Sequence, residues 1–191
     1  MEKIILASQS PRRKQLLEWA EIDFTVEAST ADETYPPGLP VEEVPVFIAS
    51  NKAKAVQQKI KHNSIILAAD TIVVLNGEVI NKPANRDDAI KILRSLSGEI
   101  HRVITGVVLL HDEKQISFAD ITQVEFHALT DEQIFFYVDK YKPYDKAGAY
   151  AIQEWIGVTG IKSIHGDFYN VMGLPVSRVV KELNKFRWKK F

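Results

Sequence analysis

Residues 65–80 constrain the fold of this chain more than any other segment. Residues 65–69 and 72–75 are β-branched and apolar, which is typical of buried strands. Asn76-Gly77 follows directly and is the strongest short signal for a hairpin turn, with 78–80 as the returning strand. We therefore expect an antiparallel hairpin here.

The rest of the chain alternates between short apolar runs and helical patterns. Further strands are expected at 4–7, 101–110 and 115–126, and helices at 10–20, 41–61, 85–97, 130–140 and 175–183. Residues 25–38 have the composition of a polar excursion that ends in a Pro-Pro-Gly break, and 142–173 match no pattern. Because no repeat or linker interrupts this order, we expect a single domain over 1–191.

Composition excludes several classes of chemistry. The 191 residues include no cysteine, which excludes thiol nucleophiles, disulfide frameworks and thiolate metal sites. A chain of this length can bury roughly 70% of its unfolded surface without such cross-links. Lys and Arg number 24 against 25 Asp and Glu. Binding to a nucleic acid polymer or an anionic membrane would therefore need a local basic patch, whereas a small anionic ligand is compatible with this balance.

The apolar run at 4–7 is too short for the hydrophobic region of a secretory signal. No uninterrupted apolar stretch approaches the ~18 residues of a membrane-spanning helix. We therefore expect a cytoplasmic protein without a membrane partner.

The first expected helix begins with two hydroxyls and two guanidiniums, in the run Ser8-Gln9-Ser10-Pro11-Arg12-Arg13. Ser10-Pro11 is a typical N-cap and first-turn pair. Helix-start amides favour an anion, and forked arginine donors match phosphate oxygens. The segment predicts a phosphate site. The alternative is an ordinary cap with two surface arginines, which would oppose the helix dipole.

Asp70 interrupts the apolar run Ala68-Ala69-Asp70-Thr71, where an unpaired buried carboxylate is costly. It either caps a bulge or has a function. With Glu33 it could hold a hard divalent cation through oxygen ligands, as magnesium is held beside substrate phosphates. Asp70 could also accept a proton from an attacking water.

Lys52, Lys82 and Gln153 are weaker candidates when each is taken alone. Each lysine is typical of a solvated charge, although Pro83 restricts the backbone of Lys82 to extended geometry. The amide of Gln153 offers a donor and an acceptor that suit uracil or thymine, whereas a loop glutamine is the simpler interpretation.

Other catalytic motifs do not occur in the sequence. The five histidines lack metal-ligand spacing, and there is no Gly-x-Ser-x-Gly, Walker A or Gly-x-Gly-x-x-Gly motif. Serine-hydrolase, P-loop and Rossmann interpretations are therefore disfavoured.

Taken together, these segments resemble the Maf family of nucleoside triphosphate pyrophosphatases. The most specific matches are Ser-x-Ser-Pro-Arg-Arg at 8–13 and Asp-Lys-Ala-Gly-x-Tyr-x-Ile-Gln at 145–153. Matches in the same order span nearly the whole chain: 6–13, 32–33, 49–53, 69–71, 82–83, 96–105, 145–153 and 171–175.

The resemblance implies an α/β fold with a mixed, strongly curved sheet, flanking helices and two lobes around a deep cleft, similar to the inosine triphosphate pyrophosphatases. It also implies a homodimer, and hydrolysis of a nucleoside triphosphate to the monophosphate and pyrophosphate with Mg²⁺ or Mn²⁺. Arg12, Thr71 and Gln153 fall on positions that mark the dTTP/UTP branch. We therefore expect dTTP and UTP as substrates, with modified pyrimidine nucleotides as further candidates.

Within this resemblance the residues fit one mechanism. Glu33 and Asp70 would hold the metal, and Asp70 would orient or deprotonate water. Gln153, with Thr71, would bind the pyrimidine edge. The triphosphate would be bound by one hydroxyl and four cationic side chains: Ser8, Arg12, Arg13, Lys52 and Lys82.

Two alternatives remain open from the sequence. One is a pyrophosphatase that prefers 7-methyl-GTP or a modified pyrimidine nucleotide. The other is a nucleotide-binding regulator of septum formation and cell-division arrest without turnover, which the presence of both Glu33 and Asp70 disfavours. Two features depart from the family pattern: Glu154-Trp155-Ile156 follows Gln153 in place of a glycine, and the tail at 187–190, expected to be disordered, lies outside the motifs.

Overall fold

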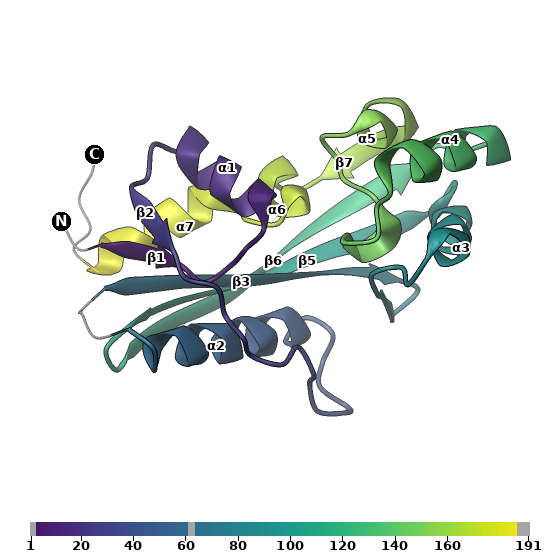
Figure 1. Ribbon diagram of the computed structural model, residues 1–191. Coiled ribbons are helices and arrows are strands. Elements are labelled where there is room, and N and C mark those ends of the chain that lie inside the picture. Colours follow the sequence, from purple (N-terminus) through teal and green to yellow (C-terminus); the bar gives the residue numbers. More distant parts are fainter. Residues whose placement is uncertain (1–2, 61–63, 187–191) are drawn as a thin grey trace. The chain divides into compact units, whose positions relative to one another are not determined.

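The computed structural model describes residues 3–60 and 64–186 (Figure 1). This described part contains a seven-stranded sheet with neighbour order β2-β1-β3-β5-β6-β7, in which β4 also pairs with β3. Strand β1 runs parallel to β2 and β3, whereas the β3–β4 and β6–β7 pairs are antiparallel. The strands are β1 Ile4–Leu6, β2 Phe24–Val26, β3 Ile65–Leu75, β4 Glu78–Ile80, β5 Ile100–His111, β6 Lys114–Phe126 and β7 Ile161–His165.

Helices flank these strands, which confirms the mixed α/β fold. They are α1 Pro11–Trp19, α2 Val44–Gln57, α3 Arg86–Leu96, α4 Asp131–Tyr141, α5 Trp155–Gly160, α6 Phe168–Met172 and α7 Val176–Leu183, with 3₁₀ turns η1 Ala147–Ala149 and η2 Asn184–Phe186.

The chain divides into two compact units. Unit 1 contains Met1–Asp70, Thr105–Asp120 and Gly173–Phe191, and unit 2 contains Thr71–Ile104 and Ile121–Met172. A single domain, the curvature of the sheet and a cleft between lobes stay predictions.

Small side chains let α2 lie close to the strands of unit 1. Ala49, Ala53 and Val56 of α2 pack in one buried cluster with Ile5 and Ala7 of the β1 segment. The same cluster also contains Ile66 and Ala68 of β3 and Val108 and Leu110 of β5. Figure 1 shows α2 on one face of these strands and α1 and α7 on the other. Side chains alternate between the two faces of a strand. Because helices cover both faces of these strands, apolar side chains are needed on both faces.

Gly106 of β5 allows the closest backbone approach in this packing. A Cβ at Gly106 would lie 2.2 Å from the backbone nitrogen of Val46 and 2.3 Å from the carbonyl carbon of Pro45. Glycine is therefore required here, and the first turn of α2 lies directly against the strand.

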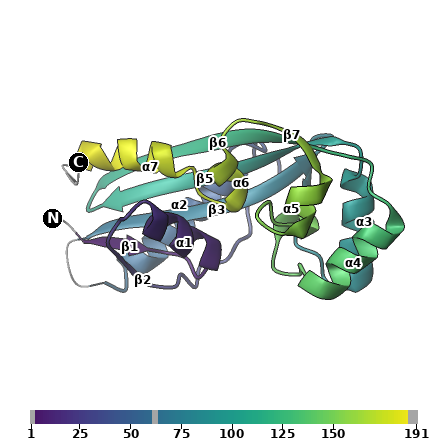
Figure 2. The same cartoon turned by 90° about the horizontal axis from the view of Figure 1, so that it is seen from above.

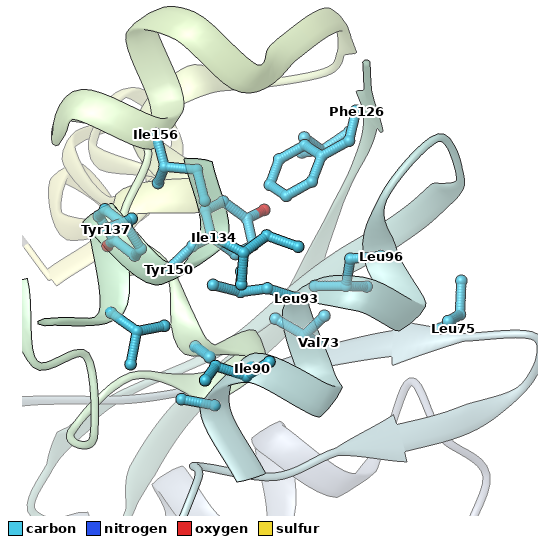
Figure 3. Packing of buried hydrophobic residues seen from close by; sticks show 14 of the residues in the cluster. Val73, Leu75, Ile90, Leu93, Leu96, Phe126, Ile134, Tyr137, Tyr150 and Ile156 are labelled. Carbon is cyan, nitrogen blue, oxygen red and sulfur yellow. The ribbon is translucent and has the colours of Figure 1, made fainter. Parts of the chain in front are cut away.

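Unit 2 has its own core, built on the apolar faces of α3 and α4 (Figure 3). Leu93 and Leu96 of α3 pack in one cluster with Ile134 and Val138 of α4. Figure 2 shows the two helices side by side, and the pair Arg94 Nε–Asp131 Oδ1, at 2.9 Å, joins them. An amphipathic stripe on each helix thus closes over the ends of the strands in this unit.

Caps and turns match the sequence expectations where the signal is local. The side chain of Asn85 accepts from the amide of Asp88 at the start of α3. Thr130 and Gln133 form both bonds of a capping box at the start of α4. Asn76 and Gly77 both have positive φ, as a type I′ hairpin turn requires.

Several element predictions are corrected. Strand β2 begins at Phe24 and runs into the segment expected to be a polar excursion, because it pairs with β1. Strand β3 continues through Asp70 and Thr71. Helix α1 has Ser10 at its N-cap position, but the Ser10 side chain makes no capping hydrogen bond.

Other boundaries were placed too widely or left open. Helix α2 ends at Gln57, and the expected end at Lys61 lies outside the described residues. The unassigned stretch 142–173 contains η1, α5, β7 and α6. The tail at 187–190 also lies outside the described residues. Of the helices in 3–60 and 64–186, none combines the length and apolar character needed to span a bilayer.

His101 is buried in the core of unit 2. Its Nε2 lies 2.7 Å from the hydroxyl of Tyr150, and its ring contacts Phe126 edge-on, with centroids 5.2 Å apart. Burial disfavours the imidazolium and lowers the pKa of His101 from 6.5 to about 4. Burial also raises the pKa of the Tyr150 hydroxyl. Both groups are therefore neutral at physiological pH.

Gly106→Ala is expected to destabilise the protein by about 3 kcal/mol, because the added methyl group would overlap backbone atoms that cannot move without displacing α2. Urea unfolding followed by circular dichroism measures this loss. Gly38→Ala is the control, since Gly38 has positive φ but no atom within 4 Å of a Cβ. Its cost is expected to be about 1 kcal/mol. Equal losses in the two variants would contradict the close approach.

Acid is expected to destabilise the protein through His101. Between pH 6.5 and 4 the imidazole of His101 is protonated in the unfolded state and neutral in the folded state. The free energy of unfolding therefore falls as the pH falls. From pH 7 to pH 5 the wild type should lose about 2 kcal/mol more than His101→Gln. Urea unfolding at the two pH values measures the difference. His127→Gln, at an exposed histidine, is the matched control for the loss of an imidazole.

Candidate functional site

Ser8 lies in the short loop between β1 and α1. Its Oγ accepts from the amide of Ser10 and from Nη1 of Arg13, each at 3.2 Å. Neither bond uses the hydroxyl proton of Ser8, which can therefore be donated to a ligand oxygen. The first amides of α1 have no side-chain cap, so this loop presents several donors at a helix start.

Arg13 is buried beneath this loop. Its Nε donates to the carbonyl oxygen of Gly173 at 2.8 Å, so one guanidinium connects the β1–α1 loop to the residues before α7. The pKa of Arg13 is lowered, mainly by burial and further by the charge of Arg12, while the carboxylates of Asp70 and Glu33 oppose this shift. A positive charge thus lies behind the Ser8 loop, within electrostatic reach of both carboxylates. Arg12, the next residue back, is half-buried.

Lys52 joins three segments of unit 1. Its Nζ lies 2.7 Å from Oε1 of Glu33, in the loop after β2, and 2.7 Å from Oδ1 of Asp70, in β3. The side chains of Lys52 and Asp70 are each 12% exposed, whereas that of Glu33 is 51% exposed. The Asp70 carboxylate is therefore a paired charge within a continuous strand, which offsets the desolvation that an unpaired one would suffer.

The two carboxylates fit a hard divalent cation. Both offer oxygen ligands, and both already face one cationic nitrogen, so their oxygens converge on a single point. Within the described residues no group of three or more His, Asp or Glu side chains is arranged to hold a metal. A cation held by Glu33 and Asp70 would therefore need other oxygens to complete its shell, such as waters and phosphate, which is typical of magnesium.

The expected site residues fall in both units. Ser8, Arg12, Arg13, Glu33, Lys52 and Asp70 belong to unit 1, where the contacts above bring most of them together. Thr71, Lys82 and Gln153 belong to unit 2. Thr71 is half-buried in β3, whereas Lys82, after β4, and Gln153, before α5, are exposed.

The carbonyl of Gly173 is a site component that residue-by-residue sequence analysis missed. A main-chain oxygen carries no side-chain signal, and it lies 160 positions from Arg13 in the chain. The only available indication was the family-like run at 171–175.

Comparisons with known proteins establish the family of this chain. The family model described as "Maf-like protein" matches residues 3–186. A protein of Cytophaga hutchinsonii named dTTP/UTP pyrophosphatase is 52% identical over 95% of this chain and 83% of its own length. A protein of the same name from Bacteroides thetaiotaomicron is 49% identical over 96% of this chain and 95% of its own length.

A solved structure supports the fold alone. The Ham1 protein of Staphylococcus aureus superposes with a TM-score of 0.52 at 17% sequence identity, over 96% of this chain and 100% of that one. With a family model that covers residues 3–186 and relatives near 50% identity, this chain belongs to the Maf family.

Proposed function

We propose that this protein is a nucleoside triphosphate pyrophosphatase that converts dTTP and UTP, and related modified pyrimidine nucleotides, to the monophosphate and pyrophosphate. The observation that carries the proposal is the group formed by Lys52, Glu33 and Asp70, which places two carboxylates and one ammonium within hydrogen-bond distance. The names of the relatives from Cytophaga hutchinsonii and Bacteroides thetaiotaomicron support the choice of substrate.

The β1–α1 loop would bind phosphate oxygens. The Ser8 hydroxyl proton and the first amides of α1 would donate to them, and Arg12 would add a forked cationic donor. Arg13 would act through its charge from beneath the loop and would keep Ser8 oriented. Preorganised donors of this kind stabilise charge that develops on phosphate in the transition state.

Glu33 and Asp70 would hold Mg²⁺ or Mn²⁺ together with the substrate. The bound ion supplies charge neutralisation and polarises the phosphate under attack. Lys52 would then exchange its contacts with the two carboxylates for phosphate oxygens, because its ammonium and the ion compete for the same oxygens.

Asp70 would also orient the attacking water and accept its proton. The water oxygen forms a bond to the α-phosphorus, the bond from that phosphorus to the bridging oxygen breaks, and pyrophosphate leaves with the electron pair. The nearby cations Lys52 and Arg13 would stabilise the charge that the leaving group gains.

Specificity for the base is proposed to come from unit 2. Gln153 would pair with the adjacent N–H and carbonyl of uracil or thymine, with Thr71 as a second polar contact. Lys82 would bind phosphate. A homodimer located in the cytoplasm completes the proposal, and light scattering after gel filtration tests the dimer.

Asp70→Asn should lower kcat by about 10³-fold, because the amide cannot accept the proton of water and binds a divalent ion weakly. The assay is pyrophosphate release from a panel of dTTP, UTP, CTP, GTP and 7-methyl-GTP. Asp32→Asn is the matched control, since Asp32 is exposed and bonds only within its own loop to Thr34. Turnover of Asp70→Asn at the wild-type rate would contradict the role of Asp70, and a preference for 7-methyl-GTP would contradict the substrate.

Metal binding should depend on Glu33. Chelation with EDTA is expected to abolish turnover, and Glu33→Gln should weaken Mn²⁺ binding by about tenfold in the presence of a non-hydrolysable UTP analogue. Isothermal titration measures this affinity directly. Asp32→Asn again serves as the control and should bind Mn²⁺ as the wild type does.

A further inference from the structure

We propose that Tyr137 is a positioning residue that fixes the loop carrying Gln153 and so sets the discrimination between uracil and cytosine. The inference rests on the proposed function, in which Gln153 binds the pyrimidine edge. Every residue in the argument belongs to unit 2.

The hydroxyl of Tyr137 bonds to the loop on both sides of Gln153. It accepts from the backbone amide of Ala151 at 3.2 Å and donates to the carboxylate of Glu154. Ala151 lies two residues before Gln153, and Glu154 lies one residue after it. One phenol therefore closes a clamp around the segment that presents the glutamine.

Tyr137 is itself immobilised by the core. Its side chain is fully buried and belongs to the cluster of Ile134, Val138 and Ile156 (Figure 3). Its ring stacks on Tyr141, with centroids 4.9 Å apart and an interplanar angle of 24°. Close packing leaves a buried aromatic ring little freedom, so the hydroxyl is held at a defined point.

Further bonds hold the same loop from other directions. Tyr150 bonds to the buried His101 at 2.7 Å. The buried ammonium of Lys146 lies 3.5 Å from the Glu154 carboxylate and 2.8 Å from that of Asp145. Of the residues from 149 to 153, only Gln153 is exposed. The backbone is thus fixed while the amide side chain faces outward.

Recognition of a pyrimidine depends on the orientation of this amide. Uracil presents an N–H beside a carbonyl, whereas cytosine presents a ring nitrogen acceptor beside an amino group, so the two bases need opposite orders of donor and acceptor. A glutamine free to rotate and shift could satisfy either base. A clamped backbone removes the shift and fixes the point from which the Gln153 side chain reaches the base, so a placement matched to uracil leaves polar groups of cytosine unpaired.

Tyr137→Phe removes the clamp and keeps the ring. The kcat/KM of UTP relative to that of CTP is expected to fall about tenfold, mainly through a higher KM for UTP, since the misplacement lies away from the reacting phosphorus. Steady-state pyrophosphate release measures both parameters, and thermal melting monitors the fold. Tyr141→Phe is the matched control, because it removes a hydroxyl from the stacked ring without touching these bonds.

Glu154→Ala provides a second variant that leaves Tyr137 in place and should also lower the UTP/CTP ratio. Gln153→Ala in the same assay distinguishes the proposed binding of the base by Gln153 from the proposed positioning of that residue by Tyr137. An unchanged ratio in Tyr137→Phe together with a reduced ratio in Gln153→Ala would overturn the positioning role and leave the proposed function standing. Failure of the wild type to release pyrophosphate from UTP, or an unchanged ratio in Gln153→Ala, would overturn the proposed base recognition and the positioning role with it.

Discussion

The contact of one ammonium with two carboxylates is the central polar contact of the candidate site in unit 1. Glu33 comes from a loop, Lys52 from a helix and Asp70 from the middle of a strand, and the charges meet at 2.7 Å on either side of Nζ. Two carboxylates against one ammonium leave an excess of negative charge at this point, and Arg13 lies within electrostatic reach of both carboxylates. This imbalance favours the addition of a further cation, which the divalent ion proposed to accompany the triphosphate would supply.

The position of Lys52 is set by backbone packing before any charge acts. Helix α2 meets β5 at Gly106 and rests on the sheet through alanines, so its axis is fixed by steric contact. Ion pairs between long side chains have little geometric precision of their own, because the side chains have many rotamers. The packing of α2 places Nζ of Lys52 near the carboxylates of Glu33 and Asp70, and the ion pairs then stabilise that arrangement.

Sequence alone predicted the features whose causes are local. The capping box at Thr130 and Gln133, the cap at Asn85 and the turn at Asn76-Gly77 depend on a few adjacent residues, and each forms as expected. Strand β2 was missed because only pairing with β1 makes three such residues a strand. The roles of the Gly173 carbonyl and the Tyr137 hydroxyl were missed for a similar reason. Every residue has a main-chain carbonyl, so the sequence does not distinguish that of Gly173. A tyrosine on the apolar face of a helix is typical of a core residue, so the sequence does not indicate the bonds of Tyr137. The segments of the candidate site could be recognised, but not the contacts between them.

The two units differ in the interactions that hold the polar residues of the candidate site. In unit 1 the central contacts are between full charges, and a ligand that carries phosphate and a metal ion competes for each of them, so Lys52 can exchange partners at little net change in charge pairing. In unit 2 the backbone amide of Ala151 bonds to the hydroxyl of Tyr137, and Tyr150 bonds to His101, within an apolar core, while the ion pair of Lys146 with Glu154 also holds the loop. Breaking the bonds of the two buried hydroxyls would leave buried polar groups unpaired. The side chains proposed to bind phosphate could therefore rearrange during a reaction while the loop that carries Gln153 keeps its shape, and the proposed hydrolysis with base selection requires both properties.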